Sequence, residues 1–378
     1  MFDPRLERLA DVLVNYSVAV RKGDVVTIQG NTASDPLVLC LYRAVLQAGG
    51  NPWVRLAPED CEELFLKHAS DAQLRYTSEF DRHIMSRVNA RIGIWADVNT
   101  RALTNVDPTR QAAQSKARKP IMDVFFKRAA KSAADPDRLR WVGTAYPTPG
   151  MAQDAEMSLS EYADFIFNAG KLNQRDPVAA WKKLGVAQQR LIDRLRKAKE
   201  IRFTAPNGTD LRVGVAGRKW INCDGHENFP DGEVFTGPIE DATEGTVCYH
   251  FPAVYDAREV SDIRLVFKAG RVVDCSAGKN EDFLIKMLDQ DKGARTLGEI
   301  AIGTNYQIQR YTKNTLFDEK IGGTFHAALG AAYPESGGKN KSALHWDKVC
   351  DLRQGGVIEA DGVAISRNGK FLNAAWPK

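Results

Sequence analysis

The sharpest candidate for metal chemistry is the segment Ser-Ala-Leu-His-Trp-Asp at 342–347. In an extended strand, residues i and i+2 point to the same face, so His345 and Asp347 would present an imidazole and a carboxylate side by side. Such a pair can ligate Zn²⁺ or a similar ion. Alone it is weak evidence, because His-x-Asp often occurs by chance.

A second imidazole lies in the small, apolar segment 322–334. His326 and Tyr333 are seven residues apart, which would place both on one face if the segment were a helix. A buried imidazole needs a polar partner. The alternative for His326 taken alone is a hydrogen-bonded core histidine.

Two glutamates also stand in apolar surroundings. In Phe-Pro-Asp-Gly-Glu-Val-Phe-Thr-Gly-Pro (229–238), a Pro-Asp-Gly turn precedes Glu233, which opens an apolar strand. Glu299 lies within Leu-Gly-Glu-Ile-Ala-Ile-Gly (297–303). A surface carboxylate is the alternative for each, but apolar neighbours on both sides argue for pairing or metal ligation.

Together these residues form a chemically coherent set. Carboxylates can bridge two divalent ions, and imidazoles and terminal carboxylates can fill the remaining positions. Two ions about 3.5–4 Å apart lower the pKa of a bridging water and polarise a carbonyl. A tyrosine phenol can donate a hydrogen bond to the developing oxyanion. The set therefore indicates hydrolytic chemistry.

The elements expected in the first half alternate between helix and strand. An amphipathic helix is predicted through Leu6–Tyr16, and a second from Asp35 to the Gly49-Gly50 pair. Strands are predicted at 25–28, 54–56, 91–95 and 141–144. This order predicts an α/β N-terminal domain with a mostly parallel sheet. The turn at 29–34 lacks Gly-x-Gly-x-x-Gly, so a nucleotide cofactor is not expected.

The second half has a different pattern. A polar helix is predicted at 187–200, and turns at 207–208, 268–271 and 368–369 separate strand-like runs. We therefore expect an α+β C-terminal metal-binding domain rich in antiparallel strands. The predicted domains are residues 1–190, the scaffold, and 191–378, the catalytic part.

Composition limits the function classes. The 378 residues are 43% hydrophobic and carry a net charge of +4, which favours neither a nucleic-acid partner nor a membrane. No apolar run reaches membrane-spanning length, and the first residues do not resemble a secretory signal. Six scattered cysteines without a Cys-x-x-Cys pair fit a reducing, cytoplasmic location, and most are expected to be buried.

Four motifs in order resemble the thermophilic aminopeptidase family of dinuclear metallopeptidases, which includes aminopeptidases T and S and PepS. They are 229–238, Leu-Gly-Glu-Ile-Ala (297–301), Thr-Phe-His-Ala-Ala-Leu-Gly (324–330) with Tyr333-Pro334, and 342–347. The order and the spacing both match, and the resemblance extends over the whole chain.

The resemblance implies a fold, an activity and a site. It implies an N-terminal α/β domain, a C-terminal metal-bearing domain, and a homodimer that encloses a cavity and removes N-terminal residues from small peptides. It implies two divalent ions per chain (Zn²⁺, Co²⁺ or Mn²⁺). The implied metal ligands are Glu233, Glu299, His326, His345 and Asp347. Tyr333 is implied as a catalytic hydrogen-bonding residue, and Glu299 as general base, ligand or both.

Alternatives remain for the site and its surroundings. His326, His345 and Asp347 would also suit the facial triad of a mononuclear iron dioxygenase, and some ring-cleaving dioxygenases resemble this peptidase fold. The extra carboxylates of Glu233 and Glu299 favour two metals. A non-enzymatic metal- or peptide-binding protein is a weaker alternative. Three acids that follow the Glu233 strand are candidates for binding the peptide α-amino group, with an exposed loop as the alternative: Glu240, Asp241 and Glu244. His226 is interpreted as a bystander.

Overall fold

The structure is a computed structural model that describes residues 3–255 and 258–378. The chain divides into two units. Unit 1 comprises Met1–Val178 and Gly225–Pro230, and unit 2 comprises Ala179–Asp224 and Asp231–Lys378. The domain boundary predicted at 190/191 stays a prediction.

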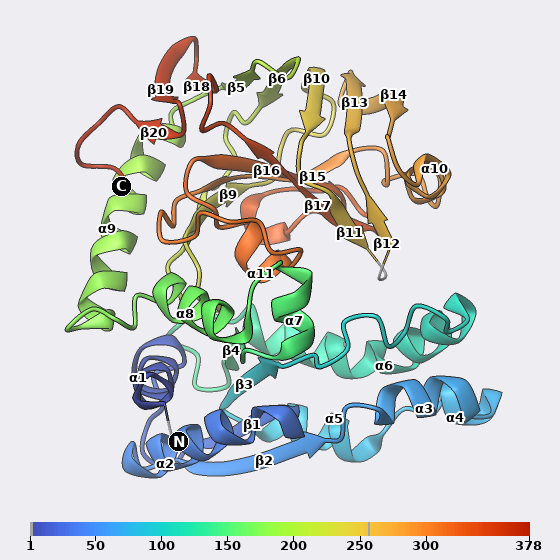
Figure 1. The fold of residues 1–378 in the computed structure, drawn as a ribbon, viewed down its shortest axis with the longest axis vertical. Helices are drawn as coiled ribbons and strands as arrows, with labels where there is room; N and C mark the ends of the chain where they lie inside the picture. Colours follow the sequence, from blue (N-terminus) through green and yellow to red (C-terminus); the bar gives the residue numbers. More distant parts are fainter. Residues whose placement is uncertain (1–2, 256–257) are drawn as a thin grey trace. The chain divides into compact units, whose positions relative to one another are not determined.

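Unit 1 is built on a five-stranded sheet in the order β2-β1-β3-β4-β8 (Figure 1). All four strand pairs are parallel. The strands are β1 (Val25–Asn31), β2 (Asn51–Ala57), β3 (Ala90–Trp95), β4 (Arg140–Ala145) and β8 (Asn228–Phe229). The predicted α/β domain with a mostly parallel sheet is confirmed.

Most of the α-helices of unit 1 begin at a side chain that caps them. Asp107, for example, accepts a hydrogen bond from the Thr109 backbone, and Pro108 occupies the first turn of α6. The helix predicted through Tyr16 ends at Val12 and continues as a π-helical turn. The helical segments are α1 (Pro4–Val12), η1 (Leu13–Ser17), η2 (Thr32–Ser34), α2 (Asp35–Gln47), α3 (Cys61–His68), α4 (Asp71–Leu74), α5 (Glu79–Arg87), α6 (Pro108–Ala129), α7 (Pro149–Asp154) and α8 (Leu159–Ala169).

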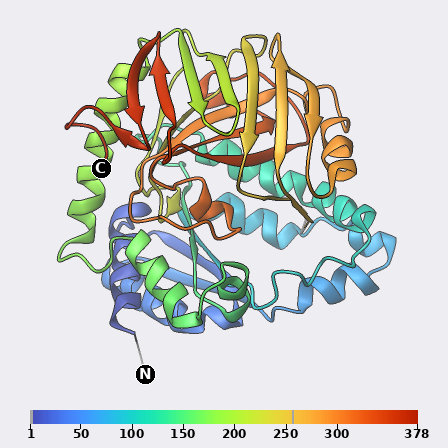
Figure 2. The ribbon, with the colours of Figure 1, turned by 45° about the horizontal axis from the view of Figure 1, so that its top comes forward.

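Unit 2 contains an eight-stranded sheet in the order β14-β13-β10-β6-β5-β18-β19-β20. Figure 2 shows its strands side by side, from red (β18, β19) through green (β5, β6) to yellow and gold (β10, β13, β14). Its strands are β5 (Glu200–Ala205), β6 (Thr209–Gly214), β10 (Thr243–Tyr249), β13 (Ile263–Lys268), β14 (Arg271–Ser276), β18 (Val357–Ala360), β19 (Val363–Arg367) and β20 (Lys370–Phe371).

The second sheet of unit 2 has five strands in the order β17-β16-β15-β9-β7. Every strand pair in both large sheets is antiparallel, which confirms the predicted α+β fold. The remaining elements of unit 2 are β7 (Ile221–Cys223), β9 (Glu233–Thr236), β11 (Ala253–Tyr255), β12 (Arg258–Val260), β15 (Leu297–Gly303), β16 (Thr324–Gly330), β17 (His345–Asp351), α9 (Pro177–Leu195), α10 (Glu281–Leu288), α11 (Thr315–Asp318) and η3 (Pro334–Ser336).

The three predicted turns lie between paired strands of the eight-stranded sheet, as expected. The helix predicted at 187–200 instead ends at Leu195, and Glu200 opens β5. Ile201 and Phe203 alternate into the core there, and this burial favours a strand over another helical turn.

The core of unit 2 covers one face of the five-stranded sheet. It contains the alternate residues Phe325, Ala327 and Leu329 of β16, and Phe325 stacks on Phe203 of the eight-stranded sheet with ring centroids 4.0 Å apart. Because side chains alternate along a strand, the residues between these core positions face away from the core.

Two further expectations are settled by burial and helix length. The six cysteines form no disulfide, but only Cys40 and Cys350 are buried, so the expectation that most are buried is wrong. Within residues 3–255 and 258–378, no helix combines the length and apolar character that crossing a bilayer requires.

Candidate metal centre

The five predicted ligands lie together on one face of the five-stranded sheet in unit 2. Glu233 opens β9, Glu299 lies in β15, His326 in β16, and His345 and Asp347 in β17. Their strand neighbours Val234, Ile300, Phe325, Ala327 and Trp346 pack into the core. The alternation of side chains therefore directs the polar residues to the opposite face.

A β-bulge sets the direction of Glu299. The pairing of β15 with β16 shifts between Leu297 and Glu299. Leu297 and Ile300 both belong to the core, which regular alternation would not allow, and Glu299 turns to the opposite face. Gly298 is required at this bulge, because a Cβ there would lie 2.1 Å from the Ala331 carbonyl oxygen.

His326 lies in a strand, so the helical placement considered for 322–334 is wrong. Thr324–Gly330 pairs with strands on both sides, and all seven of its residues are buried. Tyr333 follows this strand, immediately before η3. Its ring lies beside those of His345 and Phe235, at centroid distances of 5.1 and 5.5 Å. The phenol therefore still borders the sheet face that carries the five candidate ligands, and 42% of the residue is exposed.

Both histidines are oriented in the same way. Nδ1 of His326 lies 3.2 Å from the Glu319 carbonyl oxygen, and Nδ1 of His345 lies 2.9 Å from that of Ala331. A carbonyl oxygen only accepts, so each Nδ1 carries the hydrogen and donates it. Each Nε2 then turns to the carboxylates with its lone pair available to a metal.

Glu299 stands between the two imidazoles. Its Oε1 lies 3.4 Å from Nε2 of His326, and its Oε2 lies 3.6 Å from Nε2 of His345. Glu233 Oε2 is 3.5 Å from the first imidazole, and Asp347 Oδ2 is 3.6 Å from the second. Two donor sets therefore share Glu299: Glu233–Glu299–His326 and Glu299–His345–Asp347, each with ligand atoms within 4.8 Å of one another.

Two buried oxygens in these sets suit a cation as their partner. Oε2 of Glu233 and Oδ1 of Asp347 are buried and have no hydrogen-bond partner among the described residues. A buried carboxylate oxygen without a partner carries a large desolvation cost. Mixed imidazole and carboxylate donors are ligands that Zn²⁺, Co²⁺ and Mn²⁺ accept. The donor set therefore fits divalent metal.

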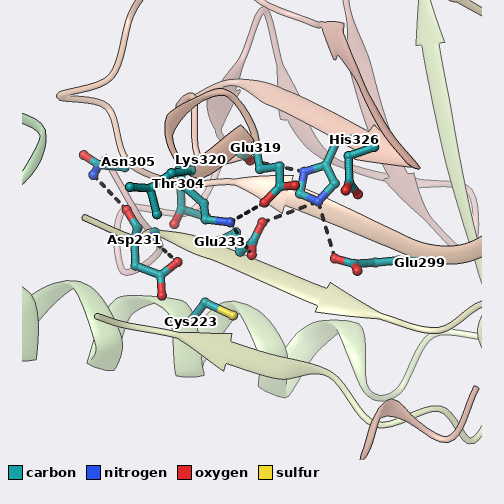
Figure 3. A network of polar contacts seen from close by, with 12 residues as sticks. Cys223, Asp231, Glu233, Glu299, Thr304, Asn305, Glu319, Lys320 and His326 are labelled. Atoms are coloured by element: carbon teal, nitrogen blue, oxygen red, sulfur yellow. Dashed lines mark hydrogen bonds and ion pairs between the residues drawn. The ribbon is translucent and has the colours of Figure 1, made fainter. Parts of the chain in front are cut away.

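The sequence interpretation missed two charged residues, Glu319 and Lys320. Lys320 Nζ donates to Glu233 Oε1 at 2.8 Å and to Glu319 Oε2 at 2.6 Å (Figure 3). Glu319 also forms a possible ligand group with His326 and Asp347. The available signal was the run Asp318-Glu319-Lys320, which is charged and directly precedes the apolar segment that carries His326.

Without metal, Asp347 and His326 bind protons more tightly than an ordinary carboxyl and imidazole do. Burial, followed by the charge of Glu319, raises the pKa of Asp347 to about 7. Burial opposes charge on His326, but the hydrogen bond with Glu299 and the charges of Glu233 and Glu319 raise its pKa to about 10. Metal binding must displace such protons.

Two of the three acids considered for binding the peptide α-amino group have structural partners. Glu240 pairs with Arg218 at 2.7 Å and accepts a hydrogen bond from the Lys339 backbone, and Glu244 accepts one from the Ala269 backbone. His226 belongs to unit 1, where its ring lies 4.6 Å from that of Tyr16.

Comparisons with known proteins identify relatives over nearly the whole chain. Residues 2–371 match the family described as thermophilic metalloprotease (M29). Aminopeptidase 2 of Geobacillus stearothermophilus is 27% identical over 416 aligned positions, which cover 99% of this chain and 98% of that protein.

Two solved structures share the fold. Wild-type AmpT from Thermus thermophilus is 25% identical, with a TM-score of 0.85 over 99% of this chain and 100% of that one. The 2,5-dihydroxypyridine dioxygenase of Pseudomonas putida KT2440 has a TM-score of 0.60 at 13% identity, over 98% of both chains. The expectation that a dioxygenase shares this fold is thus confirmed, and at that identity the likeness extends to the fold alone.

Proposed function

This chain belongs to the thermophilic metalloprotease family (M29), and we propose that it is a metal-dependent aminopeptidase that removes N-terminal residues from small peptides. Proteins similar to it over almost their full length are named aminopeptidases. The reaction is hydrolysis of the first peptide bond.

The observation that carries this proposal is the position of Glu299 between two imidazoles. One carboxylate oxygen faces each Nε2, and each imidazole also faces a second carboxylate. This arrangement supports two divalent ions, with Glu299 available as a ligand in both donor sets. One would be held by Glu233, Glu299 and His326, and the other by Glu299, His345 and Asp347. Zn²⁺, Co²⁺ and Mn²⁺ all suit these ligands.

The chain's own residues would prepare the reacting groups. Two bound divalent ions would supply an activated water and a polarised carbonyl. Glu299, at the centre of the donor set, is also the candidate to accept the water's proton, in place of or in addition to its role as a ligand. Tyr333 borders the same face and would donate its phenolic hydrogen to the oxyanion. The Ala331 and Glu319 carbonyl oxygens fix the imidazole orientations.

The experiment combines metal counting with turnover. After reconstitution, elemental analysis is expected to find about two divalent ions per chain, and aminoacyl amides and short peptides to be cleaved. Glu299→Gln is expected to lose activity. Glu240→Gln, which changes a carboxylate bound to Arg218 outside the donor set, serves as the control. One iron per chain, oxygen uptake with dihydroxy-aromatic substrates and no peptide cleavage would favour the dioxygenase.

We also propose a cytoplasmic homodimer that acts on small peptides and needs neither nucleic acid nor membrane. The absence of disulfides among the six cysteines supports a reducing compartment. The homodimer rests on the family resemblance, and size-exclusion chromatography with light scattering tests it.

A further inference from the structure

Lys320 is a fully buried cation beside the candidate ligands. Its side chain is 1% exposed, and its Nζ donates to one oxygen of Glu233 and one of Glu319 (Figure 3). A buried ammonium is costly unless carboxylates compensate it, and the side chains of Glu233 and Glu319 are only 6% and 13% exposed. The three charges therefore depend on one another.

Lys320 forms a hydrogen bond with only one of the two carboxylate oxygens of Glu233. Oε1 accepts its hydrogen bond, whereas Oε2 lies 3.5 Å from Nε2 of His326 and has no hydrogen-bond partner among the described residues. Only Oε2 is then available to a metal. Bidentate ligation by Glu233 would require the ammonium to leave.

A further group of possible ligands lies on the far side of Glu233. Cys223, Asp231 and Glu233 offer ligand atoms within 4.8 Å of one another, and Cys223 pairs with Glu233 in the register of β7 and β9. Thiolate and carboxylate donors suit Zn²⁺ and Co²⁺. The sheet therefore presents a further possible cation site, which includes a thiol, next to the two proposed ions.

The charge of Lys320 acts on this same group. Lys320 Nζ lies 2.8 Å from Glu233 Oε1 and 2.6 Å from Glu319 Oε2, and Glu233 is itself a member of the group with Cys223 and Asp231. The ammonium thus already provides the positive charge that a third ion would bring.

We propose that Lys320 is a positioning residue that acts as a fixed cation beside the metal pair. It restricts Glu233 to ligation through one oxygen and prevents a third ion from binding at Cys223, Asp231 and Glu233. The proposal rests on the proposed function in one respect, the assignment of Glu233 as a metal ligand.

Lys348 provides a matched control. It is also a fully buried lysine beside a candidate ligand, Asp347. Its Nζ donates to the Trp346 carbonyl oxygen at 3.1 Å and lies 3.8 Å from the centroid of the Trp346 ring. Lys348→Met removes a buried lysine side chain without removing a partner of Glu233.

The test is a Co²⁺ titration followed by elemental analysis and optical absorption. Wild type and Lys348→Met are expected to stop at two ions per chain. Lys320→Met is expected to bind three and to gain a thiolate-to-cobalt charge-transfer band. Adding Cys223→Ser to that variant should remove both the band and the third ion. If Lys320→Met does not fold, Lys320→Gln replaces it, because the amide removes the charge and retains hydrogen-bonding capacity.

Two results would overturn the role of Lys320. One is a folded Lys320→Met or Lys320→Gln variant that binds two ions or fewer and shows no thiolate-to-cobalt band. The other is a wild-type chain that takes up a third ion with that band in excess cobalt. A wild-type chain that binds no metal would refute the proposed function instead, so the two failures are distinguishable.

Discussion

Glu299 and Asp347 stand in one row across the five-stranded sheet, separated only by the methyl group of Ala328. Ala328 pairs with Glu299 on one side and with Asp347 on the other. Side chains in such a row project in parallel. The small residue between them therefore leaves space in which both carboxylates and His345 can share a metal.

Ala328→Val is expected to fill this space. The added methyl groups would separate the two carboxylates, so metal affinity should fall on the order of 10- to 100-fold, as for other changes that misplace ligands. Valine suits a strand, so the fold should persist. Isothermal titration with Zn²⁺ measures the affinity, and Ala328→Ser, a smaller change, is the control. Unchanged zinc affinity in the valine variant would show that the space beside Ala328 is not needed for metal binding.

Gly298→Ala is expected to disturb the bulge that directs Glu299. The new Cβ would lie 2.1 Å from the Ala331 carbonyl oxygen, so the backbone must shift. Ala331 also accepts the hydrogen bond of His345, so the shift should reach two ligands. We expect a loss of about 1–3 kcal/mol in the free energy of unfolding and weaker metal binding.

Chemical denaturation of the metal-free chain measures the first effect of Gly298→Ala, and metal titration measures the second. Gly93→Ala is a suitable control, because its Cβ would meet only the Val142 carbonyl oxygen, at 3.9 Å. Equal effects of the two substitutions would argue against a special role of the bulge.

The sequence is sufficient to predict where a side chain lies when its position depends on a short pattern. The pair at 345 and 347 was predicted from the two-residue repeat of a strand, and Glu233 from a carboxylate at the start of an apolar run. The strand of His326 was not predicted, because small apolar residues suit a helix or a strand, and only pairing with β15 and β17 decides between them.

The bulge and Lys320 could not be predicted for a different reason. The sequence Leu-Gly-Glu-Ile (297–300) is compatible with a regular strand. The register shift at Gly298 arises only from the pairing with β16. Lys320 looks like a surface lysine until the fold brings it to Glu233, 87 residues away in the sequence.

Asp347→Asn is expected to change how the stability of the metal-free chain depends on pH. Burial and Glu319 raise the pKa of Asp347 from 3.8 to about 7. Between these values the folded state holds more protons than the unfolded state, so stability falls as pH rises. Below pH 4 the carboxyl is protonated in both states and gives no such loss.

Relative to Asp347→Asn, the wild type should therefore lose up to about 1.4 kcal/mol per pH unit between pH 4 and 7. Urea unfolding of both chelated proteins at constant ionic strength measures this difference. Asp241→Asn controls for the removal of an acid outside the donor set. A difference between wild type and Asp347→Asn that stays constant over this range would rule out the raised pKa.

Tyr333→Phe is expected to reduce turnover while leaving metal binding intact. The ring would keep its contacts with Phe235 and His345, so only the hydroxyl is lost. Desolvation, with the charges of Glu299 and Asp347, raises the pKa of Tyr333, so the phenol keeps its proton and can donate. Loss of an oxyanion donor lowers kcat by about 10²- to 10³-fold. Because the oxyanion forms only in the transition state, KM should change little.

Steady-state kinetics on an aminoacyl amide measures turnover by the Tyr333→Phe variant, and elemental analysis of the same sample measures its metal content. Tyr311→Phe, which removes a hydroxyl bonded to the Pro252 carbonyl, is the control. A Tyr333→Phe variant with wild-type kcat and two ions would exclude the phenol from catalysis.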